Sequence, residues 1–291
     1  MPSLTLLSLL RAGRVVYASE KLLNKTGHAH ETFEDFVDFA IANAGELHLL
    51  RFDEVVKDMI VEARATNQTL RRVEDLYQLP RIAVPFHHLW MEAVTPGGHR
   101  VCCLSNKYED EAGAYHIRLL TGVGCAYSGQ PVVSFPMGML TVSVRADGKI
   151  IGCLQGTFFD ETKDQKLMQA ARGVAFIACH AFARLGCKNV QCVPMAGQWK
   201  PKKKNQAMPF SIWHEIRVQA IPARGQSKEP SGEHRQIRHH WVRGHFADYT
   251  GGKGLFGKYR DVFWVPEFTR GDYSLGSVRQ THVVGSNAMA Q

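Results

Sequence analysis

The chain has 291 residues, an apolar fraction of 45% and a formal net charge of +8. That length allows one large domain or two small ones, and the apolar fraction is ordinary for a globular protein with a sizeable core. The longest apolar run, near residues 173–182, is far shorter than the roughly 20 residues that a membrane-spanning helix needs, which favours a soluble protein.

The net charge is concentrated in the C-terminal third of the chain. Residues 200–291 hold 15 Lys and Arg against 7 Asp and Glu, whereas the remainder holds 20 of each kind. Such a basic region is the electrostatic signature of a protein that binds phosphate or another acidic surface. The alternative is a solvated face whose charge serves solubility alone.

The seven cysteines predict a reducing environment. Their number is odd, most lie inside apolar runs, and the N-terminus reads as an amphipathic helix rather than as a secretory leader. We therefore expect buried, reduced thiols in a cytoplasmic protein. No CxxC motif occurs, and neither the pair Cys102 and Cys103 nor the pair Cys187 and Cys192 has the spacing of zinc ligands, so no metal or other cofactor is predicted.

Residues 1–80 are predicted to form a helical region that covers a sheet. Apolar residues recur at helical spacing from Leu6 to Val16, after a plausible N-cap at Thr32, and over Phe52–Ala65. Gly45 marks the end of the second helix. No catalytic motif is present in these three segments.

Residues 81–160 are predicted to form an antiparallel β region. Five short runs rich in β-branched or apolar residues are separated by turn signals, of which Asp147-Gly148 is the strongest hairpin signal. The adjacent His87 and His88 are interpreted as structural. The five predicted strands are residues 99–104, 115–120, 132–135, 139–144 and 150–154.

Residues 161–271 are predicted to form a buried helix followed by a basic antiparallel meander, which makes the whole chain an α+β protein. The helix, Lys163–Leu185, is apolar nearly all round, and His180 on it is interpreted as a core residue. Residues 272–291 are predicted to be a flexible tail. Basic loops link the four predicted strands, which are residues 189–193, 210–219, 236–246 and 261–268.

The strand predicted at 236–246 carries an unusual density of histidine and arginine. If it is continuous, alternation places His239, Arg243 and His245 on one face and His240 on the other. Neighbours on one face lie about 7 Å apart and the outer pair about 20 Å apart. Arg243 and His245 can then share one phosphate, while His239 contacts the next.

Binding of RNA or single-stranded DNA is the function that these residues favour. Cations contact the phosphates, aromatic rings stack on unpaired bases, and the glycines of the segment from Thr250 to Lys258 let backbone N–H groups approach an anion. Trp264 is a further stacking candidate. The predicted binding residues are Lys202, Lys203, Lys204, Arg238, His239, Trp241, Arg243, Lys253, Lys258, Tyr259 and Arg260.

Two alternatives stay open. The first is a metal-independent endoribonuclease, with His240 and His245 as acid and base, Arg243 and Lys258 as charge stabilisers, and Tyr249 as an orienting donor. A helix followed by a strand meander resembles the layout of small bacterial ribonuclease toxins. The second is a non-enzymatic interaction protein whose basic face binds an acidic host partner.

A set of short motifs resembles a recurrent segment of uncharacterised phage and mobile-element proteins. These motifs are H-x-V-R-G-H-F at residues 240–246, G-L-F-G-K at 254–258, then F-W-V and a closing Arg270-Gly271. The segment from Val84 to Glu92 is similar to a weaker upstream pattern in the same proteins. The resemblance implies a phage or mobile-element origin, and hence the cytoplasm of a bacterial host, without implying an activity.

Overall fold

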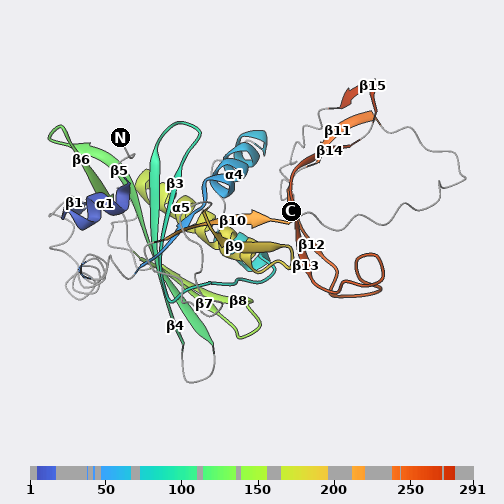
Figure 1. Cartoon of the computed structure of the whole chain (residues 1–291), viewed down its shortest axis with the longest axis horizontal. Helices are drawn as coiled ribbons and strands as arrows, with labels where there is room; N and C mark the ends of the chain where they lie inside the picture. Colours follow the sequence, from blue (N-terminus) through green and yellow to red (C-terminus); the bar gives the residue numbers. More distant parts are fainter. Residues whose placement is uncertain are drawn as a thin grey trace, which may run out of the picture.

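The fold is dominated by one large β-sheet, with two small sheets near the C-terminus and few helices (Figure 1). It is described from a computed structural model that covers residues 5–17, 38, 42, 47–66, 73–109, 114–135, 139–155, 165–195, 212–219, 238–242, 244–270 and 272–278. Of the helix predicted to begin at Thr32, only residues 38 and 42 are described, and both are helical. The segment with Lys202, Lys203 and Lys204 lies outside this description, as does Arg243.

The large sheet has ten strands. Eight of them run in the order β1-β6-β5-β4-β3-β2-β10-β9, while β7 pairs with β5, and β8 pairs with β7. The long strand β5 pairs with β7 through its first half and with β6 through its second. The ten strands are β1 (Val15–Tyr17), β2 (His48–Arg51), β3 (His88–Val94), β4 (Arg100–Glu109), β5 (Tyr115–Tyr127), β6 (Gln130–Phe135), β7 (Met139–Val144), β8 (Ile150–Gln155), β9 (Val190–Pro194) and β10 (Trp213–Val218).

The five strands predicted between residues 99 and 154 are confirmed as β4 to β8. Strand β5 pairs antiparallel with β4, β6 and β7, and β7 pairs antiparallel with β8. Turn residues with positive φ join them, as glycine permits: Gly129 has φ 76° and Gly148 has φ 86°. The prediction missed β3, which pairs antiparallel with β4. The sheet is nevertheless mixed, because β1 runs parallel to β6, and β2 runs parallel to both β3 and β10.

The predicted N-terminal helical region is only partly correct. Helix α1 (Leu6–Arg11) starts at the N-cap Thr5, but it ends before Val15, which begins β1. Gly13, with φ 64°, turns the chain there, and the β-branched pair Val15-Val16 favours a strand. Helix α4 (Asp53–Thr66) is confirmed, although β2 directly before it was not predicted. The order β2, α4, β3 makes a crossover between two parallel strands. A short 3₁₀ helix, η1 (Val73–Gln78), lies between α4 and β3.

Helix α5 (Gln165–Leu185) is the predicted buried helix, and it packs on β4 and β5 beside α4. Its residues 174–176 and 178–184 are buried, so the helix needs the apolar surround that the sequence shows. The core between α5 and the sheet includes Ile117, Leu119, Val142 and Phe182. Figure 1 shows α5 running along the sheet, with the C-terminal strands gathered at one side of it.

The predicted C-terminal meander is wrong, because its strands belong to three sheets. Strands β9 and β10 extend the large sheet, β12 (His245–Asp248) pairs with β13 (Val262–Val265), and β14 (Phe268–Arg270) pairs with β11 (Arg238–Val242). Gly244 separates β11 from β12, and a Cβ atom there would lie 2.7 Å from the ring of Trp264. Residues Asp272–Val278, predicted as part of a tail, form β15 parallel to β11.

Candidate functional site

The β12–β13 hairpin is docked on the end of α5 by buried apolar residues. Trp264 is only 3% exposed, and its ring contacts Phe246 with ring centroids 4.9 Å apart. The Arg184 guanidinium lies 3.9 Å from the centre of the same ring, and His180 meets it edge-on at 5.5 Å. Trp264 therefore holds the hairpin in place and is not a stacking surface for bases, contrary to the prediction.

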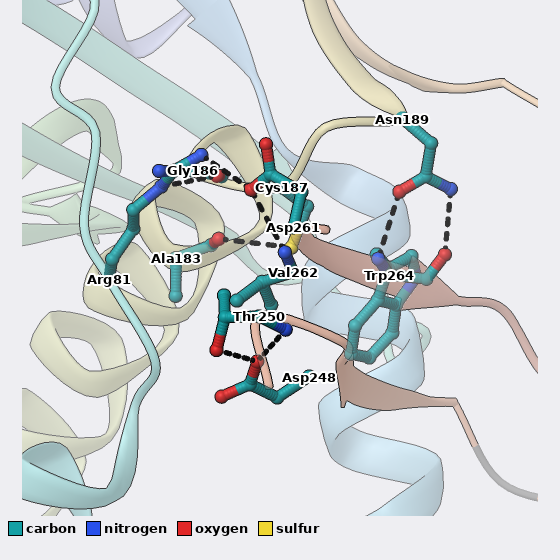
Figure 2. A network of polar contacts seen from close by, with 10 residues as sticks. All are labelled: Arg81, Ala183, Gly186, Cys187, Asn189, Asp248, Thr250, Asp261, Val262 and Trp264. Carbon is teal, nitrogen blue, oxygen red and sulfur yellow. Dashed lines mark hydrogen bonds and ion pairs between the residues drawn. The ribbon is translucent and has the colours of Figure 1, made fainter. Parts of the chain in front are cut away.

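The backbone of the second strand of the hairpin is held by hydrogen bonds from the segment that follows α5. The Asn189 side chain donates from Nδ2 to the Trp264 carbonyl at 2.8 Å and accepts from the Trp264 N–H at 2.9 Å (Figure 2). The Lys188 N–H donates to the Val262 carbonyl at 2.9 Å. The segment that follows α5 thus acts as a short partner for β13, so the hairpin is part of the folded core.

An ion pair anchors the hairpin at the point where β13 begins. The Arg81 guanidinium donates to the Gly186 carbonyl at 2.8 Å and to Asp261 Oδ1 at 3.0 Å (Figure 2). The same carboxylate oxygen accepts from the Val262 N–H at 2.9 Å. Neither Asn189 nor Arg81 was predicted as a functional residue, since their partners lie 75 and 180 residues away in the sequence.

The tip of the hairpin, residues 249–260, is named the basic loop. At its start, Asp248 Oδ1 accepts from the Thr250 N–H and hydroxyl at 2.8 and 2.7 Å, and these bonds lower the pKa of Asp248. Leu255 and Tyr259 exchange two backbone hydrogen bonds, which close a tight turn. The rings of Tyr249 and Tyr259 both contact Phe263, edge-on. These contacts define the turn from Leu255 to Tyr259 and join both tyrosine rings to β13.

The basic loop displays cations and aromatic rings together. Lys253, Lys258 and Arg260 are exposed, and none of them forms an ion pair with a residue that the structure describes. Phe256 is 44% exposed and Tyr259 40%. The loop contains no acidic residue, and the flanking Asp248 and Asp261 are engaged by Thr250 and Arg81. Its positive charge is therefore available to a ligand.

The structure brings together only part of the predicted binding set. Lys253, Lys258, Tyr259 and Arg260 share the basic loop. Arg238, His239 and Trp241 lie on β11 in the three-stranded sheet. Phe256 was missed, although it stands within the motif G-L-F-G-K. Its φ of 53° is rare for a bulky residue, and the neighbouring glycines permit the turn that holds it outward.

The described members of the predicted catalytic set lie on separate elements. His240 belongs to β11, whereas His245 belongs to β12, so the single strand that was to carry His239, Arg243 and His245 on one face does not exist. His245 pairs with Val265 at one end of the hairpin, whereas Lys258 lies in the basic loop at the other end. Three residues along a strand separate groups by roughly 10 Å, so the length of β12 stands between His245 and the loop that carries Lys258, and the ribonuclease alternative stays a prediction.

Apart from the hairpin, the structure contains a cavity of about 490 Å³. It is lined by residues of β2, β10, the start of α4 and the end of β13. Its cations are paired with carboxylates. Arg51 binds Asp53 at 2.8 Å, Arg184 binds Asp58 at 2.7 Å, and Arg217 pairs with Glu215. The fourth cation, Lys57, lies 3.7 Å from Glu54. Glu267 adds a fifth carboxylate to the lining, so the cavity offers no unpaired cation to an anionic ligand.

The described residues form no disulfide, no cluster of potential metal ligands and no membrane-spanning helix. All seven cysteines are free, and burial raises the pKa of Cys187 and Cys192 to about 12. Within the described ranges, no cluster of three or more His, Cys, Asp or Glu side chains is placed to hold a metal ion. In that same part of the chain, no helix has the length and apolar character that crossing a membrane requires.

No protein-family model, curated protein or solved structure matches this chain. The resemblance to phage and mobile-element proteins therefore stays a prediction.

Proposed function

We propose that the protein binds single-stranded nucleic acid, RNA or DNA, through the basic loop. The observation that carries the proposal is the exposure, in one loop, of three cations and two aromatic rings: Lys253, Phe256, Lys258, Tyr259 and Arg260. A polyanion with unpaired bases needs both kinds of contact.

The cations supply the part of the affinity that does not depend on base sequence. Each phosphate neutralised by Lys or Arg releases a counterion, so the logarithm of the affinity falls with the logarithm of salt by about 0.7 per phosphate on a single strand. Three unpaired cations in the basic loop predict a slope of about −2. Because backbone hydrogen bonds already close the turn from Leu255 to Tyr259, less conformational entropy is lost there on binding.

The aromatic rings favour a single strand over a duplex. Stacking on a protein ring contributes about 1–3 kcal/mol per base, and it requires a base that is not already stacked within a helix. Phe256 and Tyr259 lie on the same short turn as Lys258. The setting we propose is a phage or mobile element acting in the cytoplasm of a bacterial host, on the strength of the sequence resemblance.

Fluorescence anisotropy with labelled 12-nucleotide RNA, single-stranded DNA and duplex DNA, over a range of salt, tests the proposal. The triple variant Lys253→Gln, Lys258→Gln, Arg260→Gln should lose most of the affinity and most of the salt slope. The matched control is Lys57→Gln, an exposed lysine on α4 that pairs with Glu54. Equal affinity in the wild type and the triple variant would refute binding through the loop. If a nuclease-treated host extract instead yields an acidic protein that the triple variant no longer binds, the loop serves protein interaction.

A further inference from the structure

We propose that the face of the large sheet opposite α5 carries a separate binding site for a phosphate group, centred on Arg118. This site, named the sheet-face cluster, is independent of the nucleic-acid function proposed for the basic loop. Its residues come from three adjacent strands: Asn106 and Tyr108 on β4, His116 and Arg118 on β5, and Thr141 and Ser143 on β7.

Strand register places these six side chains together. Arg118 pairs with Asn106 on one side and Thr141 on the other, and His116 pairs with Tyr108 and Ser143 in the same way. Directly opposed side chains have Cβ atoms about 4.5–5.5 Å apart. Tyr115, Ile117 and Leu119 belong to the core under α5, so alternation turns His116 and Arg118 to the other face.

Arg118 offers the cluster an uncompensated positive charge. Its guanidinium lies 4.6 Å from the centre of the Tyr108 ring, and it forms no ion pair or hydrogen bond with any residue that the structure describes. By contrast, Arg51, Arg145, Arg184 and Arg217 each bind a carboxylate. The cluster itself contains no acidic residue. An anion therefore complements it.

The neighbours of Arg118 supply hydrogen-bond donors at a surface that a ligand can reach. The side chains of Asn106 and Thr141 form no hydrogen bond with residues in the described ranges, and all six members of the cluster are partly exposed. The guanidinium, amide and hydroxyl groups together offer more hydrogen-bond donors than the two oxygens of a carboxylate can accept. A phosphate, with three or more oxygens and a higher charge, matches them better.

His116 is held in a defined place at the edge of the cluster. Its Nδ1 lies 2.9 Å from Ser143 Oγ, and its ring stacks on Tyr108 with centroids 5.0 Å apart and an interplanar angle of 23°. Ser143 faces Gly152 on β8, where an added Cβ would lie 3.4 Å from the Ser143 Cβ. The absence of a side chain on Gly152 leaves room beside the serine for a ligand oxygen.

Two-dimensional NMR titration of the whole chain with inorganic phosphate tests the site directly. We expect saturable shifts of the β5 and β7 amides, and at least about a tenfold loss of affinity in Arg118→Gln, since one charged partner is removed. Arg118→Lys should restore part of the binding. The matched control, Arg145→Gln, removes an exposed arginine that Asp147 already neutralises, and it should bind as the wild type does.

A second titration with adenosine 5′-monophosphate identifies the source of the phosphate. Tighter binding than inorganic phosphate indicates a nucleotide, whereas equal binding indicates a phosphate group without a base, and both support the site. No saturable shift up to about 20 mM phosphate, or undiminished binding by Arg118→Gln, overturns it.

If Arg118→Gln has a lower melting temperature than the wild type, Ser143→Ala serves instead, with a few-fold loss expected from one hydrogen bond. Anisotropy with single-stranded RNA should be unchanged in every one of these variants, so the two proposals fail separately.

Discussion

The folded core and the basic loop use the same charged residue types in opposite ways. In the core, Arg184 is 3% exposed and is neutralised by Asp58, and the partly exposed Arg51 nearby is paired with Asp53. In the loop, Lys253 and Lys258 are exposed, with no ion pair to any described residue. A buried cation requires a partner, because removing a charge from water is costly, whereas an exposed one does not. Cations without a partner therefore mark the surface that is available to a ligand, whereas paired cations mark the parts that stabilise the fold.

The hairpin is where the two regions meet, and Trp264→Ala should break their connection. The change empties a site packed by Phe246, His180 and Arg184, and we expect the free energy of unfolding to fall by about 3–5 kcal/mol. Urea denaturation followed by circular dichroism measures the loss. The control is Phe268→Ala, an exposed aromatic just beyond β13, for which we expect a change within about 0.5 kcal/mol. Equal stability of the two variants would mean that the hairpin is not part of the core.

The sequence predicted the central strands well because their signals are local. The segments that form β4 to β8 are short runs rich in β-branched or apolar residues, and the Asp147-Gly148 pair by itself predicts the turn at Gly148. The C-terminal strands could not be placed in this way. The end of β11 depends on Gly244 meeting Trp264, and the pairing of β10 with β2 joins residues more than 160 positions apart. Alternation shows that a segment is a strand but does not name its partner.

The candidate site was predictable only in outline. Composition located the positive charge in the C-terminal third, and the basic loop lies there. Which cations remain unpaired depends on contacts distant in sequence, such as Arg81 with Asp261 and Arg184 with Asp58. Arg118 was not predicted as a site residue, because only the register of β4, β5 and β7 shows which side chains surround it.

Acid should weaken the core while leaving the charge of the basic loop in place. Burial lowers the pKa of His48 to about 4, helped by the nearby His214 and His88, and burial also lowers the pKa of His214. In the unfolded chain both groups titrate near 6.5, so the unfolded state takes up protons first. Their contribution to stability is therefore complete above about pH 6.5 and is lost as the pH falls towards 4.

Urea denaturation at pH 7.5 and pH 4.5 measures this loss, which we expect to be about 1–2 kcal/mol after allowing for partial solvent exposure. His48→Phe keeps a ring against Phe86, on which His48 stacks at 3.7 Å, and should remove part of the pH dependence. Asp147, whose pKa its bonds to Arg145 and Lys149 lower to about 2, titrates below this range. A variant whose pH dependence equals that of the wild type would assign the effect to other groups.

Phe256→Gly should have the smallest effect on stability and still impair binding. The residue is exposed and has φ 53°, which glycine adopts without strain, so we expect the free energy of unfolding to change by less than about 0.5 kcal/mol. Loss of one stacking ring should weaken the binding of single-stranded RNA by about 1–3 kcal/mol, or roughly five- to 150-fold. Tyr77→Ala, which removes an exposed aromatic on η1, should leave the affinity unchanged. A core residue cannot lose its side chain without cost to the fold, so a variant that keeps its stability but loses affinity marks the loop as surface that a ligand uses. If Phe256→Gly binds as tightly as the wild type, the rings do not contact bases, and the loop binds through its cations alone.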